Sequence, residues 1–310
     1  MKRILLAAPR GFCAGVSHAL DLVEQALQRF GTPLYVRHAI VHNRQVVADF
    51  EKRGVVFVED LAEVPEGSPV IFSAHGVSPA VRVQAAQRRL QTIDATCPLV
   101  NKVHREARSL AQRGYTLLYI GHAGHPEAEG VLGEAPEATI LVETMEEAAA
   151  VEVPDPQRVA CLTQTTLSVD EAHRLIERLR RRFPELLLPA KEDICYATTH
   201  RQEAVKALAR ECDLILVVGS PTSSNSNRLC EVARSQQVPA FLIEDATAIR
   251  PEWKTDFETV GVTSGASTPE GVVQEVITAL VDGREVEVQT VETVREKILF
   301  PPPKAWRRKV

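Results

Sequence analysis

The chain of 310 residues lacks the glycine-rich loops with which many proteins bind nucleotides. Neither the ATP-binding pattern GxxxxGKS/T nor the dinucleotide-binding pattern GxGxxG occurs, so the sequence does not support a nucleotide-binding function. The chain also lacks an excess of basic residues. Its formal net charge is −5 at pH 7, which argues against a general nucleic-acid-binding protein, because contacts with the phosphate backbone need a basic surface.

Long apolar runs are absent as well, and no segment reaches the length needed to span a bilayer. The stretch MKRILLAAPRGFC has two basic residues and an apolar patch that is too short for the core of a signal peptide. We therefore expect this stretch to form a first strand, and we expect a cytoplasmic protein with no membrane partner. The composition, 45% hydrophobic and 25% charged, allows a sizeable buried core.

Apolar, β-rich segments alternate with amphipathic segments along the chain. We predict strands at residues 4–8, 55–58, 70–72, 116–120, 159–162, 214–218, 240–243 and 259–262. Helices are predicted around residues 16–27, 100–110, 169–182 and 202–210. Strands that alternate with helices are typical of an α/β fold with parallel sheets covered on both faces. The sites of such proteins lie beyond the carboxyl ends of the strands.

The six cysteines do not have the compact spacing of ferredoxins, in which several cysteines lie within a few residues of one another. Cys13, Cys97 and Cys195 each lie in a short polar loop just ahead of a segment predicted to be helical. We predict that their thiolates converge on a soft metal or an iron–sulfur cluster, with one coordination position left open. The other three lie in or beside apolar segments and are predicted to be buried: Cys161, Cys212 and Cys230.

A group of histidines near the ends of predicted strands provides further candidates: His42, His75, His122 and His125. They could be metal ligands, as in zinc sites, or they could bind an anion or move protons. The motif GHAGHPE also contains Glu127, two residues after His125. A buried carboxyl group beside a histidine can hold a proton at neutral pH and deliver it, whereas an exposed Glu127 would only begin a helix.

Three loops rich in hydroxyl groups precede predicted helices. Their candidate residues are Thr165 and Thr166 in TQTTLS, Ser223, Ser224 and Asn225 in GSPTSSNSNRL, and Ser267 in GVTSGASTPE. As helix N-caps these side chains would need no further role. Because helix N-termini also bind phosphate, three such loops near one centre would form a donor-rich site for a phosphate or diphosphate.

Nine motifs occur in one order along the chain: PRGFCAGV, VHN, SAHGV, DATCPLV, GHAGHPE, TQTTLS, DICYATTHRQ, GSPTSSNSNRL and GVTSGASTPE. As a set they resemble the LytB/IspH family, whose members reduce 4-hydroxy-3-methylbut-2-enyl diphosphate in the non-mevalonate (MEP) isoprenoid pathway. The likeness runs from Pro9 to Val273. GHAGHPE and the three cysteine loops are its most specific part.

This resemblance implies three pseudo-symmetric α/β domains in a trefoil around a central iron–sulfur cluster. Residues 14–96 would form the first domain and residues 97–192 the second. Residues 1–13 and 193–290 would form a discontinuous third domain, because the first strand of the family packs with the C-terminal domain. Residues 291–310, which contain a proline run, would form an extended C-terminal arm.

The resemblance also implies a role for each candidate residue. Cys13, Cys97 and Cys195 match the ligands of a 4Fe–4S cluster with one open iron, which could also be isolated as a 3Fe–4S form. Glu127 matches the glutamate that supplies protons, together with His125 and Thr165 as catalytic residues. The substrate-binding positions matched are His42, His75, His125, Thr165, Thr166, Ser223, Ser224, Asn225 and Ser267.

The implied reaction is the reductive dehydroxylation of (E)-4-hydroxy-3-methylbut-2-enyl diphosphate to isopentenyl diphosphate and dimethylallyl diphosphate. Its electrons would come from an external donor such as ferredoxin or flavodoxin. The residues alone leave two alternatives open. One is a zinc-dependent hydrolase with histidine and cysteine ligands, and the other is a non-catalytic iron–sulfur carrier that would need neither Glu127 nor the hydroxyl-rich loops.

Overall fold

The computed structural model describes residues 1–301, which divide into two compact units. Unit 1 comprises Met1–Val16, His42–Val46 and Tyr196–Leu299. Unit 2 comprises Ser17–Val41, Val47–Cys195 and, among the described residues, Phe300 and Pro301. Most of the two ranges predicted as separate first and second domains thus lies in unit 2, and the division into three domains stays a prediction. The predicted arm lies partly outside the described residues.

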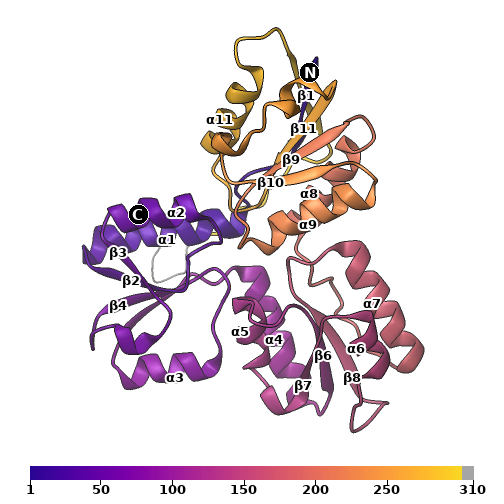
Figure 1. The fold of residues 1–310 in the computed structure, drawn as a ribbon. Coiled ribbons are helices and arrows are strands. Elements are labelled where there is room, and N and C mark those ends of the chain that lie inside the picture. Colours follow the sequence, from indigo (N-terminus) through magenta and orange to yellow (C-terminus); the bar gives the residue numbers. More distant parts are fainter. Residues whose placement is uncertain (302–310) are drawn as a thin grey trace. The chain divides into compact units, whose positions relative to one another are not determined.

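Unit 1 is built on a five-stranded parallel sheet with the strand order β10-β9-β11-β1-β12 (Figure 1). Its strands are β1 (Arg3–Ala8), β9 (Leu214–Val218), β10 (Ala240–Ile243), β11 (Thr259–Ser264) and β12 (Glu287–Glu292). Its helices are α8 (Tyr196–Leu208), α9 (Ser224–Ser235), α10 (Glu252–Thr255) and α11 (Glu270–Val281). The first strand of the chain therefore lies between two strands from its last third.

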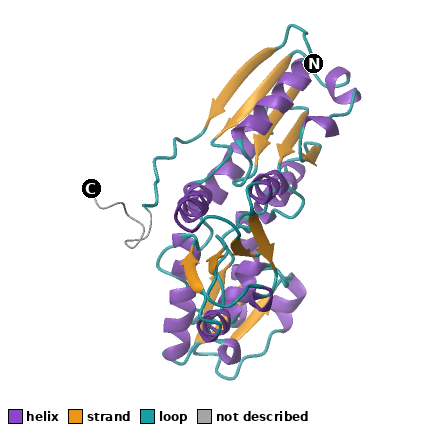
Figure 2. Ribbon diagram, turned by 90° about the vertical axis from the view of Figure 1, so that its left-hand side faces the viewer, coloured by secondary structure: helices purple, strands orange, loops and turns teal. Residues whose placement is uncertain are grey.

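Strands β1, β9 and β11 of this sheet are buried on both faces, because helices cover both sides, whereas the edge strand β12 is exposed. Ile4 of β1 and Leu216 of β9 pack with α11 on one face. Leu5 is the neighbour of Ile4 on β1, and Ile215 is the neighbour of Leu216 on β9. Both pack with α8 and α9 on the other face. Beyond β12 the described chain continues without a helix or strand towards the C terminus (Figure 2).

Unit 2 contains a four-stranded parallel sheet with the order β3-β2-β4-β5 and a three-stranded parallel sheet with the order β7-β6-β8. Their strands are β2 (Leu34–Arg37), β3 (Val55–Val58), β4 (Pro69–Phe72), β5 (Gln91–Asp94), β6 (Thr116–Ile120), β7 (Thr139–Val142) and β8 (Val159–Thr163). The associated helices are α1 (Ala14–Phe30), α2 (Arg44–Lys52), α3 (Pro79–Gln87), α4 (Pro98–Gln112), α5 (Pro126–Leu132), α6 (Met145–Ala150) and α7 (Val169–Arg182). The first residues of α1 and α2 belong to unit 1.

The three-stranded sheet is also covered on both faces. Leu117 and Leu162 pack with α4 and α5, whereas Leu118 and Cys161 pack with α7. All neighbouring strands in the described residues are parallel, so the predicted α/β class is confirmed. No helix within residues 1–301 has both the length and the apolar character needed to cross a bilayer.

Candidate functional site

In unit 1, the loops after β1 and β11 meet at the carboxyl edge of the parallel sheet, as expected for neighbouring parallel strands. The Gly11 N–H donates to Ser264 Oγ over 2.8 Å, and the Cys13 N–H donates to the Ala266 carbonyl over 3.1 Å. The Ala266 N–H in turn donates to Asn225 Oδ1 over 3.0 Å. The loop that bears Cys13 is thereby joined to the loop before α11 and to the start of α9.

Two further predicted residues belong to the same edge of unit 1. Ser267 donates its hydroxyl proton to the carbonyl of His42 over 2.9 Å. Ser223 is the N-cap of α9 and accepts from the Ser226 N–H over 3.3 Å, and Ser224 is the first residue of that helix. Unit 1 therefore combines a thiol with neutral hydrogen-bond donors at a helix N-terminus, the chemistry expected for an anion.

Two glycines let these loops approach α9 closely. A Cβ atom on either Gly219 or Gly265 would overlap the hydroxyl of Ser226, which is fully buried in the first turn of α9. Gly219 follows β9 and Gly265 follows β11. Only a residue without a side chain therefore allows both loops to pack against the start of this helix.

In unit 2, Glu127 is the second residue of α5 and is only 2% exposed, so it is not a surface glutamate. The Thr165 N–H donates to Glu127 Oε1 over 2.7 Å, and Thr165 Oγ1 donates to Oε2 over 2.8 Å. Burial raises the pKa of Glu127 to about 7, against the opposing effect of the two Thr165 hydrogen bonds. Near neutral pH the carboxyl group can therefore both hold and release a proton.

Two of the predicted histidines adjoin Glu127. His125 is the N-cap of α5, and its Nδ1 accepts from the Glu127 N–H over 3.2 Å, so a neutral ring carries its proton on Nε2. The His75 ring lies edge-on to His125 with the ring centroids 5.9 Å apart. His75 Nδ1 also lies 3.2 Å from Ser73 Oγ. These contacts join the two imidazoles to each other and His125 to the backbone of Glu127.

The same group of residues is bordered by two of the predicted cysteines. The Cys97 N–H donates to the carbonyl of Ala74, the residue before His75, over 3.0 Å. The Cys195 N–H donates to the carbonyl of Thr165 over 3.0 Å. Cys97 is also the N-cap of α4. Backbone hydrogen bonds thus hold Cys97 beside the residue that precedes His75, and Cys195 beside Thr165, which binds the Glu127 carboxyl group.

A buried histidine that was not among the predicted site residues lies between the His75 loop and the helix of Glu127. His104 of α4 is 4% exposed, and its Nδ1 lies 2.8 Å from Glu134 Oε1. A Cβ atom at Gly76, next to His75, would lie 2.8 Å from His104 Nε2, and one at Gly130 of α5 would lie 3.0 Å from Cε1. The His104 ring therefore sets the spacing between the His75 loop and the helix of Glu127.

The cysteines differ in environment, and no disulfide bond joins any of the six within residues 1–301. Cys161, Cys212 and Cys230 are 1%, 6% and 3% exposed, as predicted, and burial raises the pKa of each thiol, to about 12 for Cys212 and Cys230. The other three are half-buried and stand directly before a helix: Cys13, Cys97 and Cys195. The Val16 N–H donates to Cys13 Sγ over 3.5 Å. Thiols at helix starts suit metal ligation better than thiols inside an apolar core.

The candidate residues are divided between the two units. Unit 1 contains Cys13, His42, Ser223, Ser224, Asn225 and Ser267, and unit 2 contains His75, Cys97, His125, Glu127, Thr165, Thr166 and Cys195. Over the described part of the chain, no three His, Cys, Asp or Glu side chains are grouped so as to hold a single metal ion. Each unit thus presents only part of the predicted set.

Gln164 was not among the predicted site residues, although it lies within the motif TQTTLS. It is fully buried, and its Oε1 accepts from the His122 N–H over 3.1 Å. Its Nε2 donates to Thr166 Oγ1 over 2.9 Å. Gln164 therefore ties the GHAGHPE loop to the threonine loop. The motif TQTTLS is the sequence signal that marks this residue.

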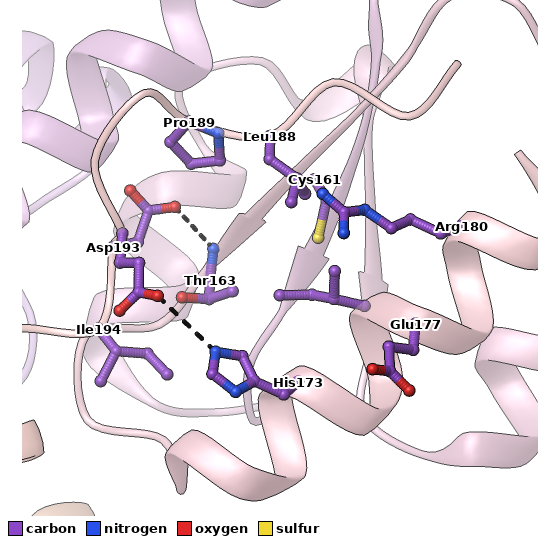
Figure 3. A pocket seen from close by; sticks show the side chains of 11 residues that line it. Cys161, Thr163, His173, Glu177, Arg180, Leu188, Pro189, Asp193 and Ile194 are labelled. Carbon is purple, nitrogen blue, oxygen red and sulfur yellow. Dashed lines mark hydrogen bonds and ion pairs between the residues drawn. The ribbon is translucent and has the colours of Figure 1, made fainter. Parts of the chain in front are cut away.

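A separate cavity of about 330 Å³ lies in unit 2 between α7 and residues 188–194 (Figure 3). Its polar wall includes Asp193, which accepts from the Thr163 N–H over 3.0 Å and from Lys102 Nζ over 2.7 Å. Arg180 and His173 of α7 also line it, together with acidic side chains. None of the predicted site residues lines this cavity, so it is distinct from the Glu127 group.

These observations define an α/β protein of parallel sheets whose loops, beyond the carboxyl ends of the strands, carry thiols, a buried titratable carboxyl group and neutral anion donors. A family profile described as LytB protein matches residues 4–281. The chain belongs to this family.

Named relatives cover nearly the whole chain. The 4-hydroxy-3-methylbut-2-enyl diphosphate reductase of Nitrosomonas europaea is 52% identical, over 98% of this chain and 97% of that protein. That of Bordetella pertussis is 53% identical, over 99% and 94%. The solved structure of the E-1-hydroxy-2-methyl-but-2-enyl-4-diphosphate reductase from Plasmodium falciparum matches with a TM-score of 0.96 at 38% identity, over 98% of this chain and 96% of that one.

Proposed function

We propose that the chain catalyses the reductive dehydroxylation of (E)-4-hydroxy-3-methylbut-2-enyl diphosphate to isopentenyl and dimethylallyl diphosphate, the last step of the non-mevalonate pathway. The observation that carries this proposal is the Glu127 carboxyl group. It is buried, is held on both oxygens by Thr165, and has a pKa of about 7. The relatives named as reductases of this diphosphate support the assignment.

The chemistry of three of the six thiols fits an iron–sulfur cofactor. Cys13, Cys97 and Cys195 are half-buried, precede helices and offer soft thiolate ligands, whereas the other cysteines are enclosed in apolar cores. We assign these three as ligands of a 4Fe–4S cluster with one iron free of protein ligands. When bound, such a cluster supplies electrons one at a time and a Lewis-acidic iron.

Glu127 provides one of the two protons that the reaction needs, the one taken up by the departing hydroxyl group. The overall change consumes two electrons and two protons, replaces the allylic C–O bond by a C–H bond and releases water. Hydroxide is a poor leaving group, so an acid must protonate the hydroxyl oxygen as the bond breaks. Thr165 holds both oxygens of Glu127 and so fixes the direction in which the carboxyl group delivers its proton.

The diphosphate is bound by histidines and by neutral hydroxyl and amide donors, not by a cluster of lysine and arginine side chains. In unit 1 these are His42 and the loop residues Ser223, Ser224, Asn225 and Ser267, of which the serines and Asn225 adjoin the N-termini of α9 and α11. His75, His125 and Thr166 of unit 2 complete the set. Backbone N–H groups at helix N-termini favour a negatively charged group, which supports this assignment.

Electrons come from an external donor such as ferredoxin or flavodoxin, and a reducing compartment such as the cytoplasm is part of this proposal. A non-catalytic iron–sulfur carrier would need no buried carboxyl group that titrates near neutrality. A zinc-dependent hydrolase would release inorganic phosphate or diphosphate from the substrate without any reductant.

The decisive experiment is anaerobic turnover of the allylic diphosphate with dithionite and a redox mediator, combined with iron and sulfide analysis. We expect a brown protein that forms the two five-carbon diphosphates only when the reductant is present. An iron-loaded protein that leaves the substrate unchanged would refute the proposal, and so would phosphate release that is independent of the reductant.

A further inference from the structure

Arg201 of α8 is the largest side chain in the described residues that is fully buried. Withdrawing a guanidinium group from water costs free energy, which a counter-ion and hydrogen bonds to its Nη atoms offset here. Nη1 donates to the Ala197 carbonyl over 2.9 Å and pairs with Glu296 Oε1 over 3.1 Å. Nη2 donates to the Gly11 carbonyl over 2.7 Å. One side chain thus joins a helix, a loop and the C-terminal segment of unit 1.

The loop that Arg201 contacts is the one that bears Cys13. Gly11 has a φ of +69°, in the left-handed region that favours glycine. Its N–H is bound by Ser264 Oγ and its carbonyl by Arg201, so both polar groups of this peptide position are fixed. Cys13 follows two residues later. Arg201 therefore restrains the backbone just before the sulfur.

The counter-ion comes from beyond the last strand of the sheet. After β12 the Thr293 N–H donates to the Ala8 carbonyl over 2.9 Å, so the C-terminal segment runs beside the end of β1. Three residues later, Glu296 Oε1 accepts from Arg201 and lies 3.1 Å from His200 Nδ1. The Glu296 side chain is only 16% exposed. The segment after β12 thus reaches the buried guanidinium group.

We propose that Arg201 and Glu296 form a buried clamp that positions the Cys13 sulfur, which makes the segment after β12 a functional part of the cluster site. Both are positioning residues, since neither supplies a ligand. This inference rests on the proposed role of Cys13 as a cluster ligand. It extends the site to the segment after β12, which was predicted from the sequence only as part of an extended C-terminal arm.

A matched pair of variants tests the clamp in the full chain. Glu296→Gln removes the buried counter-charge, and the control Glu292→Gln removes a surface pair with Arg295 on the same segment. After anaerobic reconstitution, a chelator should bleach the visible absorption of Glu296→Gln roughly tenfold faster than that of the wild type, because a charge-assisted hydrogen bond is lost. Glu292→Gln should behave as the wild type does. Equal bleaching rates in both variants would overturn the clamp.

A second comparison separates positioning from folding. Arg201→Met alone leaves the largely buried Glu296 with His200 as its remaining partner and can destabilise the unit, whereas Arg201→Met/Glu296→Met removes both charges together. We expect the double variant to unfold cooperatively near the temperature of the wild type yet to retain iron poorly. A folded double variant that retains iron as the wild type does would show that the pair has no positioning role.

Thiol reactivity gives a readout that does not need a cluster. In the protein treated with a chelator, mass spectrometry can follow the alkylation of Cys13 relative to Cys97 in the same molecules. Glu296→Gln should accelerate the modification of Cys13 several-fold and leave that of Cys97 unchanged. If the wild type binds no iron, the proposed function is refuted but the clamp is not. The clamp is refuted if Cys13 is alkylated at the same rate in Glu296→Gln as in the wild type.

Discussion

The two units of this chain treat buried polar groups in different ways. Unit 2 encloses titratable groups, and burial raises the pKa values of Glu127 and Asp193. The candidate site of unit 1, besides Cys13 and His42, encloses hydroxyl and amide groups such as Ser223, Asn225 and Ser267, which stay neutral at any ordinary pH. Proton transfer and anion binding therefore place different demands on the protein. The first needs a shifted pKa, and the second needs only oriented donors.

Replacement of a predicted ligand in unit 1 should have the largest effect. We expect Cys13→Ser to lose the broad visible absorption of the cluster almost entirely, because a hydroxyl group is a poor ligand for iron–sulfur centres. Cys230→Ala is the matched control, since Cys230 lies in the apolar core of the same unit. Iron analysis and visible spectra of both proteins check this. Full iron content in Cys13→Ser would remove Cys13 from the ligand set.

Replacement of the acid in unit 2 should leave the cluster intact and slow the chemistry. Glu127→Gln keeps the size of the side chain but cannot donate an acidic proton, so turnover should fall by about 10²–10⁴-fold. The visible spectrum and the affinity for the diphosphate should change little. Steady-state kinetics under anaerobic conditions provide the test. If turnover remains near normal, Glu127 has no part in the proton path.

The raised pKa of Glu127 also predicts how stability depends on pH. Between its ordinary pKa of 4.5 and its folded pKa of about 7, the folded protein binds more protons at this group than the unfolded chain does. Stability therefore falls as the pH rises through this window, by up to about 1.4 kcal/mol per pH unit, and levels off above it. Glu127→Gln should remove this part of the slope. Urea unfolding at pH 5, 6, 7 and 8 measures this slope. Parallel curves of stability against pH for the two proteins would contradict the prediction.

A neutral donor of unit 1 should matter least. Ser267→Ala removes one hydroxyl group, whose bond to the His42 carbonyl is 2.9 Å long. We expect KM for the diphosphate to rise roughly tenfold, corresponding to about 1.4 kcal/mol, with kcat nearly unchanged. The same KM at pH 6 and pH 8 would be typical of a neutral donor. A loss confined to kcat would instead place Ser267 with the groups that act in the chemical step.

Strands with long apolar runs were predictable from the sequence. The predicted ranges 55–58, 116–120, 214–218 and 240–243 coincide with β3, β6, β9 and β10, and the range 169–182 coincides with α7. Strands β2, β5, β7 and β12 were missed. Of these, β5, β7 and β12 lie at the edge of a sheet, whereas β2 lies within one and is only four residues long. An edge strand buries less of its surface, so its sequence can be polar, as in the exposed EVQTVE of β12.

The candidate site was predictable only as a set of residues. GHAGHPE pointed to Glu127 as an acid, because a carboxyl group beside histidines is useful when it is buried. The partnership of Arg201 with Glu296 spans 95 positions, and no local pattern marks either residue. The start of α8 was also missed. The helix begins at Tyr196, six residues before the predicted start, in a stretch whose threonines have low helix propensity.

The fold class, the family and the types of side chain available for chemistry follow from the amino-acid sequence alone, because these depend on periodicity and on motifs that are local in the chain. The enclosure of Glu127, its titration near neutral pH and the neutralisation of a buried arginine by a C-terminal glutamate depend instead on the tertiary structure. Burial and pairing depend on which distant segments pack together, and no short stretch of sequence carries that information.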